Sequence, residues 1–254
     1  VGDALGVYPQ NCFEHVDDVV RLLGMSGAEA VTIHDGRVLP LRDALLAEYD
    51  IGAASDELIE LLAGCASVSD DAALLKSLAE GNSVEGLVEE PHVVDVLARF
   101  PSARPTAANF VATLRPIRPR LYSISSSPRQ YPDEVHLTTG VVRYERDGRT
   151  RKGVASTYLA DRVLPRQPVR VFVQPAHNFA PPANPNAPMI RVGPGTGIAP
   201  FRAFLQDRRA SGAKGLNWLF FGDQRCEHDF LYRDELEQYV SDGLLTRLST
   251  AFSR

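Results

Sequence analysis

The sequence predicts a multidomain protein with a helical subdomain, a small antiparallel sheet or barrel, and an incomplete α/β domain with a parallel sheet. Three patterns support this prediction. Apolar residues recur with a helical period over residues 12–114, the period changes to two over 115–182, and strands alternate with helices over 183–254. The chain is therefore expected to change its structural class twice along its length.

Three amphipathic stripes predict helices in the first of these regions. Ser55 is the expected N-cap of the first helix, Pro91 lies in the first turn of the second, and Thr106 caps the third. The stripes consist of Leu58, Leu61, Leu62 and Cys65, then Val93, Leu97 and Phe100, then Phe110, Val111 and Leu114.

The second region contains short runs rich in β-branched residues. Residues 135–138 and 141–144 are expected to form strands, Asp147-Gly148 a hairpin turn, and residues 169–173 a strictly alternating strand. Four prolines then mark residues 178–188 as a linker.

The last region alternates strands and helices. This order predicts a parallel sheet with crossover helices, of which the chain contains half of a doubly wound sheet. The predicted strands are 189–192, 216–221 and 246–252, and the predicted helices are 199–210 and 232–242.

Composition argues against several classes of protein. The formal net charge of −5 and the even spread of lysine and arginine disfavour a nucleic-acid partner. No apolar run approaches the roughly 18–20 residues of a membrane span. The three cysteines form no C-x-x-C pair and the six histidines show no metal-ligand spacing, so we predict no metal site and a cytoplasmic protein with reduced thiols.

A glycine-rich segment between a predicted strand and helix is the strongest local motif. Glycines at 193, 195 and 197, with Thr196, would let the backbone approach a pyrophosphate at the N-terminus of the helix. Ile198 stands where the third glycine of G-x-G-x-x-G would be. A tight strand–helix turn without a ligand is the alternative.

Two shorter motifs could also contact a nucleotide. In Arg120-Leu121-Tyr122-Ser123, alternation places Arg120 and Tyr122 on one face, where they could pair with a phosphate and stack on a planar ring. A surface ladder explains the same spacing equally well. In Gly153-Val154-Ala155-Ser156, a short helix could present the amides of Ala155 and Ser156 to a phosphate, and an ordinary N-cap is the simpler interpretation.

Ser253 and Arg254 follow the third predicted strand of the parallel sheet. Ligands of open α/β sheets bind beyond that edge, and a hydroxyl with a guanidinium suits a 2′-phosphate. Asp223 follows the second strand, where NAD-preferring folds often place an acid that binds the ribose. The pattern favours NADP over NAD only modestly.

Taken in order, these motifs resemble the diflavin reductase family, which includes cytochrome P450 reductase, and they are most similar to the bacterial NADPH–sulfite reductase flavoproteins. The resemblance covers nearly the whole chain. It rests on Gly2-Asp3 with Val7-Tyr8-Pro9, Arg120–Ser123, Gly153–Ser156, Gly193–Phe201 and Ala251–Arg254.

The resemblance implies an FAD-binding barrel of residues 1–11 and 115–182, a helical connecting domain of 12–114 inserted into it, and an NADP-binding domain of 183–254. Arg120 would pair with the FAD pyrophosphate, Tyr122 would stack on the isoalloxazine, and Ser123 would lie near flavin N5. Leu121 shares their strand. The remaining implied FAD contacts are Thr138, Thr139, Gly140, Tyr144, Gly153, Val154, Ala155 and Ser156.

The resemblance also implies contacts for NADPH and a set of partners. Gly195, Thr196 and Gly197 would hold its pyrophosphate, and Ser253 with Arg254 would bind its 2′-phosphate. Asp223 stands where many relatives have a cysteine, so it joins Ser123 as a predicted catalytic position. The implied partners are an FMN domain, expected to be absent from this chain, and an electron-accepting haemoprotein such as that of sulfite reductase.

The implied activity is hydride transfer from NADPH to FAD, followed by electron transfer through FMN to the haemoprotein. A P450-reductase-like or ferredoxin–NADP-reductase-like electron transferase is the nearest alternative, and the long helical insertion disfavours a stand-alone form. A non-catalytic flavin-binding module is an alternative from another class.

Overall fold

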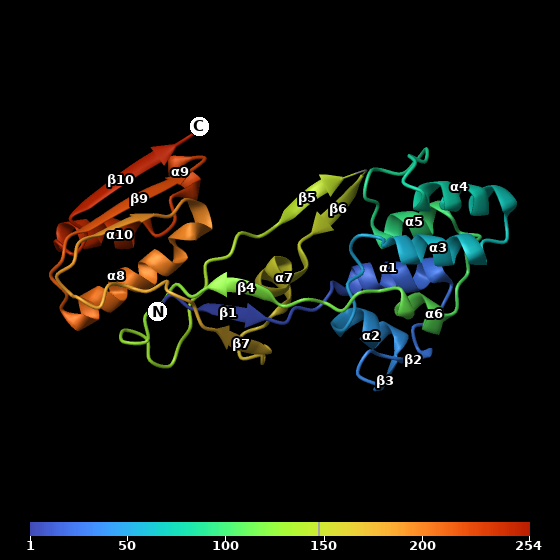
Figure 1. The fold of residues 1–254 in the computed structure, drawn as a ribbon, viewed down its shortest axis with the longest axis horizontal. Coiled ribbons are helices and arrows are strands. Elements are labelled where there is room, and N and C mark those ends of the chain that lie inside the picture. Colours follow the sequence, from blue (N-terminus) through green and yellow to red (C-terminus); the bar gives the residue numbers. More distant parts are fainter. Residues whose placement is uncertain (147) are drawn as a thin grey trace. The chain divides into compact units, whose positions relative to one another are not determined.

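The computed structural model describes residues 1–146 and 148–254 and forms two compact units (Figure 1). Asp147, one half of the predicted Asp147-Gly148 turn, lies outside the described residues. Unit 1 consists of Val1–Val7, Arg120–Val142 and Pro168–Arg254, and unit 2 consists of Tyr8–Pro119 and Arg143–Gln167. Each unit is built from segments that are distant in sequence.

Unit 1 contains a three-stranded antiparallel sheet. Strand β1 (Ala4–Val7) lies between β4 (Arg120–Ser123) and β7 (Val171–Gln174), the strand predicted over 169–173. A Cβ at Gly6 would lie 2.2 Å from the ring of Phe172, so the central strand needs a glycine at this crossing.

The second sheet of unit 1 is parallel, as predicted, with the strand order β10-β9-β8. Each of its strands and both of its longer helices agree with the predicted ranges to within two residues. These elements are β8 (Met189–Val192), α8 (Ala199–Ser211), β9 (Asn217–Asp223), α10 (Arg233–Ser241) and β10 (Arg247–Phe252), with a short helix α9 (Cys226–Asp229) after β9.

The two longer helices share one hydrophobic cluster with the middle strand. Leu219 and Phe221 of β9 alternate onto the same face and are at least 98% buried, together with Leu205 of α8 and Leu236 of α10. This packing fixes the helices against the sheet and therefore fixes the loops at its edge.

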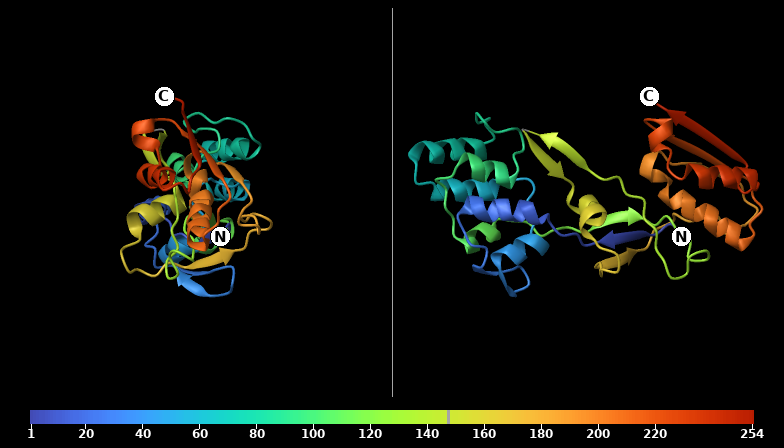
Figure 2. Two further views of the ribbon diagram at one scale, coloured as in Figure 1. Left: turned by 90° about the vertical axis from the view of Figure 1, so that its left-hand side faces the viewer. Right: turned by 180° about the vertical axis from the view of Figure 1, so that it is seen from behind.

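Unit 2 is mainly helical, as the apolar period predicts (Figure 2). Its helices between residues 12 and 114 are α1 (Phe13–Leu23), α2 (Leu41–Ala47), α3 (Asp56–Cys65), α4 (Ser69–Ala79), α5 (Val93–Arg99) and α6 (Ala107–Ala112). A short hairpin of β2 (Ala30–Thr32) and β3 (Val38–Pro40), which the helical period did not indicate, interrupts them.

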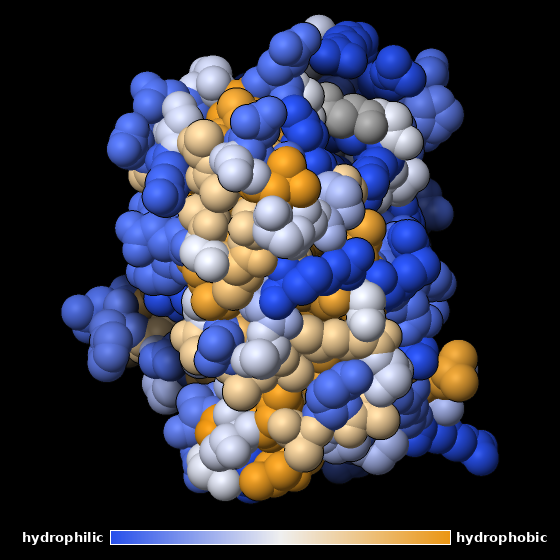
Figure 3. All heavy atoms as spheres, turned by 90° about the vertical axis from the view of Figure 1, so that its right-hand side faces the viewer, coloured by the Kyte–Doolittle hydropathy of each residue, from blue (hydrophilic) through white to orange (hydrophobic). Residues whose placement is uncertain are grey.

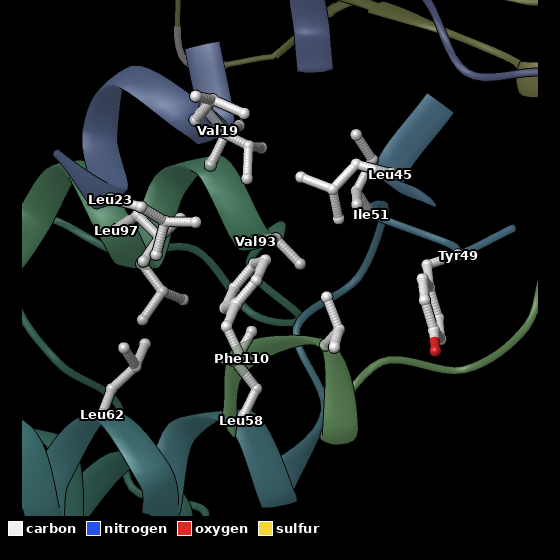
Figure 4. Close-up of a cluster of buried hydrophobic side chains, with 14 of the residues drawn as sticks. Val19, Leu23, Leu45, Tyr49, Ile51, Leu58, Leu62, Val93, Leu97 and Phe110 are labelled. Carbon is white, nitrogen blue, oxygen red and sulfur yellow. The ribbon is translucent and has the colours of Figure 1, made fainter. Parts of the chain in front are cut away.

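The predicted stripes converge on a single core in unit 2 (Figure 4). Leu58, Leu62, Val93, Leu97 and Phe110 are all at least 98% buried there. The first stripe is rotated slightly from the prediction, because Ile59 and Ala63 are buried while Leu61 and Cys65 are half-buried.

Two of the three predicted helix starts are confirmed. The hydroxyls of Ser55 and Thr106 each accept a backbone N–H three residues ahead at 3.2 Å. Pro91 was wrongly placed in the first turn of α5. That helix starts at Val93, because the Asp95 carboxylate accepts the His92 N–H at 3.1 Å and makes His92 the N-cap.

Two predicted strands between 135 and 144 differ from the structure. Residues 135–138 form only an isolated bridge between Leu137 and Ile124, because the Ser126 hydroxyl accepts the His136 N–H at 3.0 Å in place of a ladder carbonyl. The second strand begins two residues late, as β5 (Arg143–Arg146), and pairs in unit 2 with β6 (Arg149–Lys152).

In the face shown in Figure 3, hydrophobic and weakly hydrophobic residues run down the middle to the lower edge, and hydrophilic residues lie mostly along the two sides. No helix in the described part of the chain is both long and apolar enough to cross a bilayer.

Candidate functional site

Three predicted nucleotide contacts lie at one edge of the parallel sheet. The strands β8, β9 and β10 run in the same direction and end at Val192, Asp223 and Phe252. The ladder continues beyond the last strand, since Ser253 N–H donates to the Asp223 carbonyl at 3.1 Å. The glycine loop, Asp223 and the Ser253-Arg254 pair therefore share the carboxyl edge, where open α/β sheets bind their ligands.

The glycine loop is shaped for a close backbone approach. A Cβ at Gly193 would lie 2.7 Å from the Phe201 ring and 2.8 Å from the Gly197 carbonyl oxygen. Gly195 has φ +52°, which disfavours most other residues. Residues 195–198 form one 3₁₀ turn that leads directly into α8, and Thr196 and Gly197 are exposed. This helix N-terminus, where Thr196 and Gly197 are exposed, fits a pyrophosphate.

Replacing Gly193 with alanine should lower the free energy of unfolding by about 1–3 kcal/mol, because the added methyl group overlaps Phe201 and the turn backbone. Chemical denaturation measures the change. Gly64→Ala in α3 is the matched control: nothing lies within 4 Å of its added Cβ, so alanine should stabilise the helix slightly. Equal effects at both positions would contradict the close packing inferred for the loop.

Asp223 faces the glycine loop. Its Oδ2 lies 3.4 Å from the Cβ position of Gly195, and its Oδ1 accepts the Gln224 N–H at 2.7 Å. A carboxylate here can accept a hydrogen bond from a ligand hydroxyl or amide and repels a phosphate at the same point. Asp223 therefore fits the ribose or nicotinamide part of a dinucleotide better than its phosphates.

The strand Arg120–Ser123 presents an available cation and a half-buried phenol. Arg120 is exposed and makes no ion pair with the residues that the structure describes. Burial raises the pKa of Tyr122, and the nearby Arg120 charge offsets part of that rise. Leu121 is 56% exposed on the same strand. This combination of a cation, a ring and an apolar surface fits a phosphate joined to a planar ring system.

The segment 138–140 lies against the parallel-sheet half of unit 1. The Thr138 hydroxyl lies 2.6 Å from the Tyr232 hydroxyl, and the Cβ position of Gly140 is 3.8 Å from Thr196 Cγ2. Thr139 between them is half-buried. The structure thus brings two predicted contact sets, 138–140 and 195–197, next to each other.

Tyr144 and the Gly153–Ser156 turn belong to unit 2. Tyr144 is exposed on β5, and the turn forms the four-residue helix α7 (Val154–Thr157), which continues as a π-helix over Tyr158–Arg162. Arg162 donates to the Val154 carbonyl at 2.9 Å and to the Thr157 hydroxyl at 3.0 Å. The Arg162 guanidinium therefore stabilises the turn through hydrogen bonds to Val154 and Thr157.

Unit 1 also contains a polar network that no sequence motif predicted. Arg202 of α8 is 92% buried and donates to Glu235 of α10 at 2.7 Å and to the Ser125 carbonyl at 2.8 Å. The sequences of α8 and α10 do not indicate this network, because its members come from three separate segments of the chain. A charged residue on the buried face of an amphipathic helix was the one available sign. No cluster of potential metal ligands occurs among the described residues.

Two domain models match the chain. The FAD binding domain model matches residues 1–158, and the oxidoreductase NAD-binding domain model matches residues 191–248. The first match covers more than half of the chain, so the chain belongs to the FAD binding domain family.

Curated relatives narrow the resemblance to the diflavin reductases. The chain is 47% identical to the sulfite reductase [NADPH] flavoprotein alpha-component of Photorhabdus laumondii, 45% to that of Zymomonas mobilis and 46% to that of Klebsiella pneumoniae. Each match covers 100% of this chain and 41% of the relative. The predicted family resemblance is confirmed.

Proposed function

We propose that this chain is the part of an NADPH–sulfite reductase flavoprotein that binds FAD and NADPH. The observation that supports the proposal most is the contact of Gly140 with Thr196, because the first is predicted to bind FAD and the second NADPH. The two domain matches and the names of the relatives support the same assignment.

The proposed domain boundaries follow the changes of pattern in the sequence. Residues 1–11 and 115–182 form the FAD-binding barrel, residues 12–114 the helical connecting domain, and residues 183–254 the NADP-binding domain. The antiparallel pairing of β1 with β4 and β7, and the helices between residues 13 and 112, support these assignments.

The FAD contacts are proposed residue by residue. Arg120 pairs with the pyrophosphate, Tyr122 stacks on the isoalloxazine, and Ser123 lies near flavin N5. Thr138, Thr139 and Gly140 line the cofactor, Tyr144 contacts its adenosine half, and residues 153–156 hold the pyrophosphate. The exposed Arg120 and the half-buried Tyr122 support the first two roles.

The NADPH contacts lie at the edge of the parallel sheet. Residues 195–197 hold the pyrophosphate with backbone N–H groups, and Ser253 with Arg254 binds the 2′-phosphate. Asp223 accepts a hydrogen bond from the ribose or nicotinamide half. The exposure of Arg254 at the carboxyl edge supports a preference for NADP, since a guanidinium matches a phosphate in charge and geometry.

When bound, FAD would supply the redox chemistry, namely two-electron acceptance from NADPH and one-electron donation to the next carrier. The residues of this chain bind and orient the two cofactors, with Ser123 and Asp223 nearest to the reacting rings. The proposed partners are an FMN domain and, through it, a sulfite reductase haemoprotein. A cytoplasmic location is proposed for the same system.

A visible spectrum tests this function. The purified chain incubated with FAD should retain a yellow cofactor after gel filtration, and anaerobic NADPH should bleach it faster than NADH does. Arg254→Gln should reduce that preference for NADPH by about tenfold or more, because a charge-assisted contact contributes roughly 1.5–3 kcal/mol. A chain that retains no FAD contradicts the proposal, and bound FAD that NADPH leaves oxidised favours the non-catalytic flavin module.

A further inference from the structure

Tyr232 has an unusual backbone conformation for a large side chain. Its φ of +57° and ψ of 27° place it in the left-handed region at the N-cap of α10. A non-glycine residue adopts this conformation at a cost in free energy, so neighbouring contacts must hold it. Such conformations are common at functional sites, and the contacts of the Tyr232 side chain indicate what this one does.

The Tyr232 side chain is held at both its ring and its hydroxyl. The Arg202 guanidinium carbon lies 4.6 Å from the ring centroid, and the Tyr232 hydroxyl oxygen lies 2.6 Å from Thr138 Oγ1. The ring thus lies between a helix of the parallel-sheet half and a threonine of the segment that precedes Gly140. Its position depends on both.

Arg202 is itself fixed by three further partners. Its Nε donates to Glu235 at 2.7 Å, and its Nη1 donates to the Ser125 carbonyl at 2.8 Å and to His136 Nδ1 at 3.2 Å. Arginine has no acceptor, so His136 Nδ1 accepts and its Nε2–H donates to Glu134 at 2.9 Å. These hydrogen bonds therefore hold the Arg202 guanidinium against the Tyr232 ring.

The geometry leaves the Thr138 hydroxyl with hydrogen-bonding capacity for a ligand. A threonine hydroxyl has one donor hydrogen and two acceptor lone pairs. When the Tyr232 hydroxyl donates to Thr138, the threonine hydrogen remains available, and the phenol occupies one lone-pair direction and so restricts where that hydrogen can point. Hydrogen bonds in such a chain also strengthen one another.

We propose that Tyr232 is a positioning residue for FAD, which orients the Thr138 hydroxyl toward the cofactor and is held in place by Arg202. This inference rests on the proposed function, in which Thr138 lines the FAD. It assigns a role in flavin binding to a residue of the parallel-sheet half. It also explains why the backbone at the start of α10 is strained.

A double-mutant cycle on the 254-residue chain tests the inference by measuring FAD affinity through flavin fluorescence. Tyr232→Phe and Thr138→Val should each weaken FAD binding roughly threefold to tenfold, the equivalent of one hydrogen bond. The double variant should bind FAD about as weakly as either single variant, because both remove the same interaction. Thr138→Ser, which retains the hydroxyl, should restore most of the affinity.

Tyr131→Phe is the matched control, because it removes a hydroxyl of unit 1 whose hydrogen bond within the described part of the chain is with the exposed Gln130, and it retains the ring that contacts His136. Its FAD affinity should equal that of the wild type. Circular dichroism of the FAD-free variants checks that each is folded, and Tyr232→Phe retains the ring that packs on Arg202.

The outcomes separate the inference from the function on which it rests. A wild-type chain that binds no FAD overturns the proposed function and the inference together. A wild-type chain that binds FAD overturns the inference alone if Tyr232→Phe binds equally well, or if the two single effects multiply in the double variant. Non-additive losses with rescue by Thr138→Ser support it.

Discussion

Replacing Asp95 with alanine should lower the free energy of unfolding by about 3 kcal/mol, because removing one partner of a buried ion pair leaves the other charge uncompensated. Both Asp95 oxygens lie 2.7 Å from Arg151 Nη2, and the Arg151 side chain is 6% exposed. The same carboxylate caps α5 through the His92 N–H. Urea denaturation followed by circular dichroism measures the loss.

The Asp95 pair should also make stability depend on pH. Burial alone would raise the pKa of Asp95, but hydrogen bonds from Arg151 and the His92 N–H outweigh it and hold the pKa below the ordinary value of 3.8. A carboxyl with a lowered folded-state pKa stabilises the fold above its unfolded pKa. This stabilisation should therefore be lost as the pH falls from about 4 through the folded-state pKa, and Asp95→Asn should lack that part of the pH dependence.

Asp18→Asn is the matched control for the ion pair. Asp18 pairs with Arg21 on the surface of α1 at 2.6 Å, where the two side chains are 49% and 68% exposed. Its loss should change stability by less than about 1 kcal/mol. If the Asp95 and Asp18 variants lose similar free energies of unfolding, the Asp95–Arg151 pair contributes no more than an exposed ion pair, and the prediction is wrong.

Replacing Arg120 with glutamine should weaken FAD binding by about 100-fold. Arg120 is exposed and has no carboxylate partner among the described residues, so its full charge is available to a pyrophosphate. Charge-assisted contacts to phosphate contribute roughly 1.5–3 kcal/mol, and two phosphates can engage one guanidinium. Equilibrium dialysis with FAD measures the change.

Arg21→Gln supplies the same change of net charge on α1, where the arginine already pairs with Asp18. FAD affinity should not change in this variant, and raising the ionic strength should weaken wild-type binding more than that of Arg120→Gln. If both arginine variants bind FAD equally, the phosphate role of Arg120 is wrong.

The parallel-sheet half was the most predictable part of the fold. Its strands are short apolar runs, α8 begins directly after the glycine loop, and α10 ends two residues before Gly243, so local pattern and tertiary structure agree. The helical core was predictable for a similar reason, since Leu58, Leu62 and Leu97 repeat with the period that buries them.

The segment 135–138 could not be predicted from its β-branched residues. Its backbone partners are a serine hydroxyl and a distant bridge, which depend on how residues 125–127 lie against α8. The β2–β3 hairpin was missed because strands of three residues carry too little alternation to outweigh a helical surrounding pattern.

The sequence by itself determined which residue types could bind a dinucleotide, because glycine loops, phosphate-pairing arginines and stacking tyrosines depend on local chemistry and spacing. It also determined the family. Only the tertiary structure decided that the Tyr232 hydroxyl contacts Thr138 and that the Arg202 guanidinium packs on the Tyr232 ring. Thr138 and Tyr232 are 94 positions apart, and side-chain contacts at that separation depend on how the helices pack against the loop, which no local pattern encodes.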